Sequence, residues 1–338
     1  MVTAPPEVEP KKGCDYILSL IMGEKEIIHL CSKILLSGSV KQCARTLKIE
    51  VPVNLYDVDI YTQPNLSQLV RFYDNDTLLF YGTIFTVTYT TSYKTITCFD
   101  MGYFLKNNYG TYNFKNVTPE SVAQRVCTEY SIPIYNLVST GFNFSRKFSG
   151  VSIQQIIDTA YTLASESNGN KYLTRFIGAS LNIFIKGEPK STTIIEGVSN
   201  LQNMSYTFSS DGMVNAVKVY DSDGNYISSQ QNNKNPPSVY GLRTKILTKR
   251  DDTDIQKEIK AIFEDNDIER SINVTVLATN DMISGNAITL REPQTNTDGL
   301  FWIDEDSHTW QNGLHTASLT LNFKNIMREG ESGTEEKE

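Results

Sequence analysis

Residues 299–323 read GLFWIDEDSHTWQNGLHTASLTLNF, and the second half of this stretch alternates between apolar and polar side chains. Side chains on a β-strand point to opposite faces in turn, so a period of two predicts a strand with one face in a core and the other toward a polar space. The apolar positions are Ala317, Leu319, Leu321 and Phe323, and the polar positions are Thr316, Ser318, Thr320 and Asn322. The chain is therefore expected to close with antiparallel β-structure.

The first half of the same stretch predicts a partner for this strand. Residues 300–303 are aromatic and aliphatic, a composition that favours a short strand. Residues 304–307, which read Asp-Glu-Asp-Ser, and the pair Asn312 and Gly313 are typical of turns. We expect one turn at each of these two places.

The bulk composition permits packed cores and gives no sign of a nucleic-acid scaffold. The chain has 338 residues, 39% hydrophobic and 21% charged. A chain of this length has about two domains by the usual prior. The net charge of −8 argues against tight binding to phosphate backbones, because that affinity comes from clustered Lys and Arg.

No segment predicts secretion, a membrane span or a disulfide framework. Residues 1–12 lack the apolar core of a secretory signal, and no run approaches the roughly 18 apolar residues of a spanning helix. The five cysteines are scattered and include no Cys-x-x-Cys pair, which favours buried thiols in a reducing cytosol over disulfides or a zinc site. They are Cys14, Cys31, Cys43, Cys98 and Cys127.

Strand patterns dominate the chain and are interrupted once by helical patterns. Residues 1–14 are expected to form a flexible leader. Residues 15–105 hold short strands at close spacing, among them 27–34 and a hairpin over 69–84, and predict a first β-barrel domain. Residues 106–196 predict a small α+β domain.

Two helix starts mark the α+β domain. Thr118 is an N-cap residue with Pro119 at the first helical position. Ser152 opens a second helix, which Gly169 is expected to end because glycine adopts the left-handed conformation of a C-terminal cap at little cost.

Residues 197–327 return to strand patterns and predict a second β-barrel domain with one amphipathic helix over 255–263. Residues 328–338, rich in Gly and Glu, are expected to be a disordered tail. The predicted fold class is therefore mainly β, with two β-barrel domains flanking a small α+β module.

Groups that could carry out chemistry are few. His29 is expected in a strand, whereas His308 and His315 flank Trp310 near the predicted acidic turn. A histidine pair beside carboxylates could bind a metal ion or exchange protons, but a solvated hairpin turn is the simpler interpretation and is favoured. The carboxylates concerned are Asp304, Glu305 and Asp306.

Three further groups have plain structural interpretations. Residues 221–225 resemble a calcium loop, but Gly224 and Asn232 stand where an EF-hand does not place them, so a hairpin turn is favoured. Asp251 and Asp252 suit a helix cap better than a hydrolase pair. We assign no catalytic, cofactor-binding or metal-binding residue; three tyrosines could anchor an interface, namely Tyr56, Tyr61 and Tyr240.

The order of these parts resembles the baseplate hub protein of contractile-tailed phages and phage-tail-like bacteriocins, and above all the hub of PBSX-type prophages. The resemblance covers about residues 15–325. It departs from the family where Asn280 replaces a glycine before the closing-barrel turn. The segments that carry it are 70–84 in the first barrel, 117–123 and the helix after Ser152 in the middle module, and 280–290, 299–303 and 319–323 in the closing barrel.

The resemblance implies a homotrimer whose subunits each contain two barrels like those of tail-tube proteins. Three such chains would join a sixfold tail tube to a threefold central spike around an axial channel. The implied partners are further copies of the chain, the tail tube protein, the central spike protein, the baseplate wedge proteins and the tape-measure protein. No specific nucleic acid, membrane or cofactor is implied.

The same resemblance implies synthesis in the bacterial cytoplasm, assembly into the baseplate of a phage or phage-tail-like particle, and no enzymatic activity. A tail-associated cell-wall hydrolase or a carbohydrate-binding tail protein is the alternative. A hydrolase would require a catalytic carboxylate pair or a Cys/His dyad, and the sequence shows neither. A tail-tube or sheath-like protein is disfavoured because a tube subunit needs only one of the β-domains.

Overall fold

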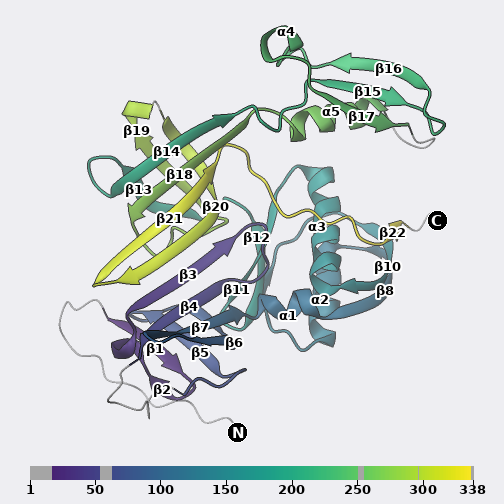
Figure 1. Cartoon of the computed structure of the whole chain (residues 1–338). Helices are drawn as coiled ribbons and strands as arrows, with labels where there is room; N and C mark the ends of the chain where they lie inside the picture. The colour runs from purple at the N-terminus through teal and green to yellow at the C-terminus, as the bar shows by residue number, and fades with distance from the viewer. Residues whose placement is uncertain (1–16, 54–62, 250–254, 296, 336–338) are drawn as a thin grey trace.

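The computed structural model describes residues 17–53, 63–249, 255–295 and 297–335, which form two β units, an α+β module and a small α/β subdomain (Figure 1). The prediction of a mainly β fold, with an α+β module between two β units, is confirmed. The predicted leader, residues 1–14, lies outside the described residues.

The first β unit contains the N-terminal strands and a single turn of 3-10 helix. Its strands alternate inward and outward, as the sequence pattern requires. The predicted hairpin over 69–84 is present, and Asn75 adopts a left-handed conformation in its turn. The elements are β1 (Leu18–Met22), β2 (Lys25–Glu26), η1 (Ile28–Leu30), β3 (Lys33–Ser39), β4 (Thr46–Pro52), β5 (Leu69–Asp74), β6 (Thr77–Tyr89) and β7 (Tyr93–Asp100).

The second β unit contains the strands that close the chain. The alternation predicted over 316–323 is confirmed for Ala317, Leu319 and Leu321, which are buried in its core, but Phe323 lies beyond the end of β21 and is 36% exposed. The elements are β13 (Lys190–Glu196), β14 (Leu201–Ser209), β18 (Glu269–Leu277), β19 (Ala287–Glu292), η2 (Pro293–Thr295), β20 (Thr297–Gln311) and β21 (Leu314–Asn322). β13 pairs with β19, so the boundary predicted at residue 196 follows a strand that belongs to this unit by hydrogen bonding.

The two β units share one hydrogen-bonded sheet. Its strand order is β14-β18-β21-β20-β3-β4-β7-β6-β5-β1-β2, with β19 and β13 attached to β20 as a side branch. The pairing of β20 with β3 joins the second unit to the first. The units are therefore two barrel-like parts of a continuous sheet.

Each part of the sheet curls around its own core. In the first unit the rings of Phe72 on β5 and Trp310 on β20 lie 4.9 Å apart edge to face, although four strands separate β5 from β20 in the sheet order. In the second unit Ile195 on β13 and Met204 on β14 join the same core from opposite ends of the strand path. This curling gives both units their barrel-like form.

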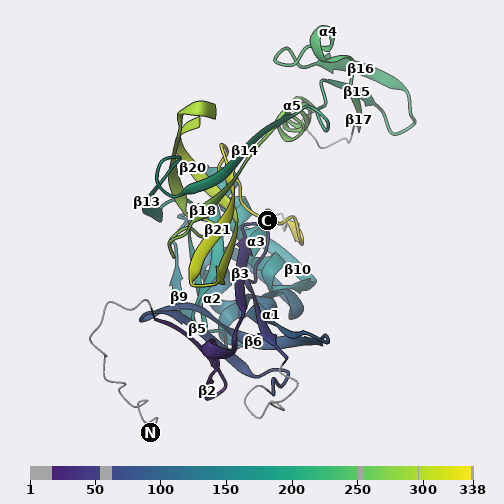
Figure 2. The ribbon, with the colours of Figure 1, turned by 60° about the vertical axis from the view of Figure 1, so that its left-hand side comes forward.

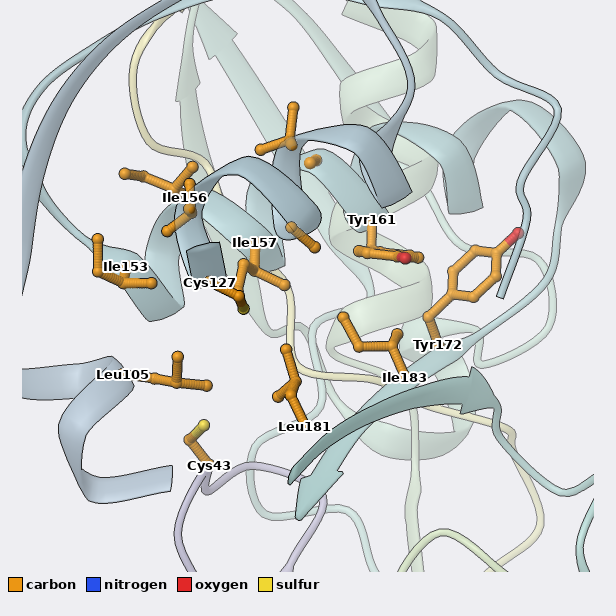
Figure 3. Close-up of a cluster of buried hydrophobic side chains, with 14 of the residues drawn as sticks. Cys43, Leu105, Cys127, Ile153, Ile156, Ile157, Tyr161, Tyr172, Leu181 and Ile183 are labelled. Atoms are coloured by element: carbon orange, nitrogen blue, oxygen red, sulfur yellow. The ribbon is translucent and has the colours of Figure 1, made fainter. Parts of the chain in front are cut away.

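The α+β module packs three helices against short sheets (Figure 1). Thr118 and Ser152 cap α2 and α3 as predicted, and Gly169 ends α3 in a left-handed conformation. Figure 3 shows the module's core, in which Ile153, Ile156 and Ile157 of α3 face the neighbouring elements. The elements are α1 (Gly102–Asn107), β8 (Tyr109–Val117), α2 (Pro119–Glu129), β9 (Ile134–Leu137), β10 (Phe144–Ser152), α3 (Ile153–Asn168), β11 (Tyr172–Ile177), β12 (Ser180–Ile185) and β22 (Thr334–Glu335).

A small subdomain is inserted between β14 and β18, which form a ribbon leading to it (Figure 2). The predicted amphipathic helix is present, and its Ile259 packs on Val217 and Val219 of the subdomain's sheet. The sequence predicted this helix but not that it belongs to a separate subdomain. The elements are β15 (Ala216–Tyr220), β16 (Tyr226–Gln231), α4 (Pro237–Tyr240), β17 (Thr244–Thr248) and α5 (Ile255–Asp265).

Two local predictions are wrong. The strand predicted over 27–34 is instead a 3-10 turn followed by the start of β3, and His29 lies in that turn. The turn predicted over 304–307 is instead the middle of β20, which continues past a bulge between Ile303 and Glu305. Asp304 and Asp306 remain in a strand because basic side chains neutralise them, as described below, whereas Glu305 points outward and is exposed.

The prediction of a disordered tail over 328–338 is also wrong for residues 328–335, the part of it that the structure describes. The C-terminal segment crosses the module and ends in β22, which pairs with β10 (Figure 1). Arg328 forms two contacts of 2.6 Å with the carboxylate of Asp158 on α3. Gly330 lies against α3 so closely that an added Cβ would be 2.6 Å from the backbone nitrogen of Thr159. These contacts fix a segment that its composition alone indicated would be loose.

Candidate functional site at the junction of the two β units

The junction is built on the length of β20. The first part of this strand pairs with β19 and the later part with β3, while β21 pairs along most of its length. The bulge between Ile303 and Glu305 changes which residues face inward, so Asp304 and Asp306 both point into the protein. Buried carboxylates require partners, because desolvation penalises an isolated charge.

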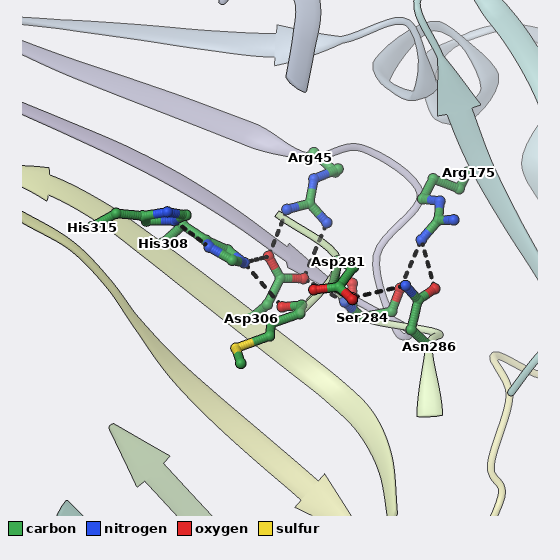
Figure 4. A network of polar contacts seen from close by, with 9 residues as sticks. Arg45, Arg175, Asp281, Ser284, Asn286, Asp306, His308 and His315 are labelled. Atoms are coloured by element: carbon green, nitrogen blue, oxygen red, sulfur yellow. Dashed lines mark hydrogen bonds and ion pairs between the residues drawn. The ribbon is translucent and has the colours of Figure 1, made fainter. Parts of the chain in front are cut away.

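Asp306 is held by a two-point ion pair with Arg45, the residue before β4 (Figure 4). The two nitrogen–oxygen distances are 3.0 and 2.5 Å, and the backbone N–H of Ser284 donates to the same carboxylate at 2.7 Å. Burial by itself would raise the pKa of Asp306, but the charge and hydrogen bonds of Arg45 outweigh burial and lower it. Asp306 is therefore an ionised anchor between the two units.

Asp304 is held by a different cation. The ammonium of Lys186, which follows β12, lies 2.5 Å from Asp304 and also donates to the carbonyl oxygen of Ile326 at 2.8 Å. The amide of Asn322 donates to the second oxygen of Asp304 at 2.7 Å. Burial lowers the pKa of Lys186, and the carboxylate of Asp304 acts in the opposite direction. This ion pair connects the α+β module, β20 and the C-terminal segment.

His308 lies on the inward face of β20 with both ring nitrogens engaged (Figure 4). Its Nε2 is 2.9 Å from the carbonyl oxygen of Met282 and its Nδ1 is 2.9 Å from Nε2 of His315. A carbonyl only accepts, so Nε2 of His308 carries a proton, and Nδ1 of the neutral ring accepts from His315. Burial lowers the pKa of both histidines, that of His315 to about 3.

Arg175, on β11, extends the polar network toward the α+β module. Its guanidinium donates to the Ser284 carbonyl and to the side-chain oxygen of Asn286 at 3.4 and 3.3 Å, and it stacks over the ring of Phe184. Burial and, to a smaller extent, the nearby charge of Arg45 together lower the pKa of Arg175 to about 10. A cavity of about 200 Å³ lies beside it.

The polar side chains of this junction form ion pairs and hydrogen bonds that hold its strands together. Asp304 and Asp306 are each neutralised by a basic side chain, and the two rings of His308 and His315 bond to each other. Within the described ranges, no group of three or more His, Cys, Asp or Glu side chains is arranged to hold a metal ion. The interpretation of the histidines as part of a solvated hairpin turn is wrong, since His308 is 2% exposed.

Sequence reasoning missed Arg45 and Lys186, the two cations of the junction. A signal was present nearby: Asp304, Asp306 and His308 continue at a period of two toward Trp310. That spacing places them on one face of a strand. Their basic partners could not be found in the same way because they lie in distant segments.

The other candidates are not brought to the junction. The side chain of Asp221 accepts from the backbone of Asp223 and Asn225 at 3.0 and 2.7 Å, which confirms a hairpin turn. Tyr240 lies in α4 and is 36% exposed. Four candidates fall outside the described residues, namely Tyr56, Tyr61, Asp251 and Asp252. Among the helices the structure describes, none is long and apolar enough to cross a membrane.

Comparison with known proteins identifies a matching protein family and a related protein of Bacillus subtilis. The sequence matches the YQBQ-like family over residues 34–322. The phage-like element PBSX protein XkdQ of Bacillus subtilis strain 168 is 20% identical over 305 residues, which cover 88% of this chain and 94% of that protein. The resemblance to PBSX-type proteins drawn from the sequence is therefore confirmed.

Two solved structures share the fold. The 43 kDa tail protein of prophage MuSo2 from Shewanella oneidensis has a TM-score of 0.68 at 14% identity, over 90% of this chain and 98% of that chain. A type VI secretion component of E. coli, described as structurally similar to the phage T4 tail proteins gp27 and gp5, has a TM-score of 0.55 at 9% identity, over 94% and 80% of the two chains. Since the family match spans both β units and the α+β module, this chain belongs to the YQBQ-like family.

Proposed function

We propose that this chain is the hub subunit of a contractile-tail baseplate, a trimeric adaptor that joins a sixfold tail tube to a threefold central spike around an axial channel. The physical basis is a matter of symmetry. A chain with two barrel-like units supplies six units when three copies associate. Such a ring matches a sixfold tube on one side while keeping threefold symmetry on the other.

The observation that carries the proposal is the strand shared by the two units. β20 places Ile303 in the core of the second unit and Trp310 in the core of the first. The continuous sheet and the Arg45–Asp306 ion pair fix the distance and angle between the units. A rigid spacing of this kind is what one chain needs to occupy two neighbouring positions of a six-membered ring.

The fold shared with the MuSo2 tail protein and with the type VI secretion component supports this assignment. We propose as partners two further copies of the chain, the tail tube protein, the central spike protein, the baseplate wedge proteins and the tape-measure protein in the channel. The chain would be made in the bacterial cytoplasm and assembled into the baseplate. No reaction is assigned to it, since the carboxylates of the junction serve as ion-pair partners.

The test is the mass and symmetry of the assembled chain. Mass photometry of the purified protein should show a particle of three times the 38.1 kDa of one chain, and a heavier particle containing three copies of it when its tube and spike proteins are added. Cryo-microscopy of that particle should show six barrel-like units around an axis. A chain that stays monomeric with both partners present, and in intact tail particles, would contradict the proposal.

The alternative, a cell-wall hydrolase or carbohydrate-binding tail protein, has its own readout. Clearing of cell walls in a zymogram by this chain alone, and its loss in a chain carrying a substituted carboxylate, would establish the hydrolase instead. Absence of clearing by a chain that forms the trimer is the result expected for a hub.

A further inference from the structure

A cavity of about 200 Å³ lies where the two β units and the α+β module meet. Two of its lining residues are exposed, Ile177 at the turn between β11 and β12 and Thr77 at the turn between β5 and β6. These two turns touch, because a Cβ added at Gly178 would lie 3.5 Å from a methyl carbon of Leu78. The cavity therefore opens to solvent beside the contact between two hairpin tips.

The wall of the cavity combines apolar side chains with a few polar groups, which is the composition typical of a ligand site. Pockets for drug-sized ligands measure about 300–1,000 Å³, so this smaller cavity suits a ligand of few atoms. The apolar lining residues include Phe80, Phe176 and Ile283, and the polar ones include Asp100, Arg175 and Asn280.

Arg175 has an unused pair of hydrogen-bond donors in this wall. Both of its hydrogen bonds come from Nη1, to the carbonyl oxygen of Ser284 at 3.4 Å and to the side-chain oxygen of Asn286 at 3.3 Å (Figure 4). Together with stacking over the ring of Phe184, these bonds fix the plane of the guanidinium. Within the described residues, Nε and Nη2 donate no hydrogen bond. Two neighbouring N–H groups of this kind can bind both oxygens of one carboxylate.

The charge of Arg175 is also incompletely balanced. Among the residues that the structure describes, Asp306 is the carboxylate whose charge acts on Arg175, and Asp306 already forms its two-point ion pair with Arg45. Burial lowers the pKa of Arg175 to about 10, so the guanidinium still carries its charge at neutral pH. A buried cation gains from an anion beside it, because the anion offsets the cost of removing the cation from water.

Two further groups in the wall are compatible with a small acid. The Oδ1 atom of Asn280 is buried and has no hydrogen-bond partner within the described residues, so a hydroxyl group or a water bound with the ligand can donate to it. Burial raises the pKa of Asp100 to about 7, although the charge of Arg45 and two backbone N–H groups oppose the rise. Below pH 7 the carboxyl of Asp100 is therefore largely neutral and does not repel an anion.

We propose that this cavity binds a small aliphatic monocarboxylate, whose two oxygens accept from Nε and Nη2 of Arg175 while its apolar part lies against the cavity wall. The site is complete within one chain, so it does not depend on the proposed hub function. Its ligand contacts both β units and the α+β module. Binding therefore also stabilises the junction of these three parts.

The test is a titration of the purified chain with sodium propionate at pH 6 and constant ionic strength. Trp310 lines the cavity, and Trp302→Phe removes the other tryptophan, so the fluorescence of this variant reports on the cavity. Propionamide has the same shape without the charge and is the matched control ligand. Propionate should change the emission of Trp310 with a Kd of roughly 1–10 mM, since so few atoms supply little binding energy. Propionamide should give no saturable change over the same range.

Three variants in the same Trp302→Phe chain locate the anion. Arg175→Gln should raise the Kd for propionate at least tenfold. Arg175→Lys keeps the charge without the paired donors and should give a smaller increase. Arg291→Gln removes an exposed arginine that pairs with Glu196 and should leave the Kd unchanged. Melting temperatures show that each variant folds, and Arg175→Lys decides the matter if Arg175→Gln does not fold.

Three results would overturn the proposal. An equal response to propionamide would make the cavity a neutral apolar pocket. No response to propionate would mean that the cavity takes up water only. An unchanged Kd in the folded Arg175 variants would place the anion elsewhere on the chain. In each case the hub function stands, because the mass and symmetry of the assembled particle test it separately.

Discussion

Arg45 and Asp306 are 261 positions apart in the sequence, and their side chains form a two-point ion pair with nitrogen–oxygen distances of 3.0 and 2.5 Å. One residue precedes β4 of the first β unit, and the other lies in β20, the strand that both units share. The pair is almost fully buried. It therefore fixes the relation between the units that the proposed adaptor function requires.

Asp306→Asn should lower the free energy of unfolding by about 3–5 kcal/mol, because it leaves the buried charge of Arg45 without its counter-ion. Urea denaturation followed by tryptophan fluorescence measures the change. The control is Arg291→Gln, which breaks an exposed ion pair with Glu196 and should cost no more than about 1 kcal/mol. Equal losses in the two variants would contradict the importance of the junction.

Acid should destabilise the protein through its histidine pair. Burial lowers the pKa of His315 from about 6.5 to about 3, so the unfolded chain binds the proton more tightly than the folded chain. The stability that the folded protein keeps while His315 is neutral is fully present above pH 6.5 and is lost as the pH falls toward 3. The slope is at most about 1.4 kcal/mol per pH unit for one histidine, and partial exposure of His315 reduces it.

His315→Gln keeps a hydrogen-bond donor near His308 but removes the titrating ring. Its stability should therefore depend less on pH between 6.5 and 3 than that of the parent chain, as measured by denaturation at several pH values. His29→Gln, which replaces an exposed histidine, is the matched control. A parent profile that is flat over this range would show that the pair does not couple protonation to folding.

Gly330→Ala should destabilise the docked C-terminal segment. An added Cβ would lie 2.6 Å from the backbone nitrogen of Thr159, and overpacking of this kind costs about 1–3 kcal/mol. Hydrogen exchange should then show faster opening of residues 330–335 and of the neighbouring β10. Gly212→Ala is the matched control, because an added Cβ there meets nothing within 4 Å. The same exchange pattern in both variants would argue that the segment is not packed as described.

Trp310→Ala and Ile303→Ala should destabilise the same unfolding transition, although the two side chains lie in different cores. Removing such buried side chains costs about 2–5 kcal/mol each. Since one sheet runs through both β units, differential scanning calorimetry should show them melting together. Two separated transitions, each shifted by only one of the substitutions, would contradict a single cooperative block.

The inserted subdomain should behave differently from that block. It connects to the rest of the chain through the β14–β18 ribbon, and its small core is built around Val217, Val219 and Ile259. Few buried contacts mean a low free energy of local opening. Hydrogen exchange should be faster in β15, β16 and β17 than in β4 and β21. Equal protection would indicate that the subdomain is held by contacts beyond its own core.

Much of the local structure was predictable. The alternation of Ala317, Leu319 and Leu321 predicted β21, and the side chains of Thr118 and Ser152 predicted the starts of α2 and α3. These features are produced by interactions between residues that are close in the sequence, so a local sequence pattern is enough to predict them. The mainly β character followed from the same patterns, and the order of the predicted parts along the chain carried the resemblance to the family.

The predictions that failed share one physical origin. The carboxylates of Asp304 and Asp306 indicated a solvated turn, and the Gly- and Glu-rich C-terminal segment indicated disorder. Both expectations hold only for charges that remain in water. The structure supplies Arg45, Lys186 and Asp158 from distant segments, and a neutralised charge can be buried in a strand or on a helix.

The sequence by itself determined most of the stretches that form strands and helices and the faces that they bury, because periodicity and capping act over a few residues. Only the tertiary structure decided that β20 pairs with β3 and unites two β units in one sheet. Strand pairing joins residues hundreds of positions apart, and no local pattern states which edge a strand will meet.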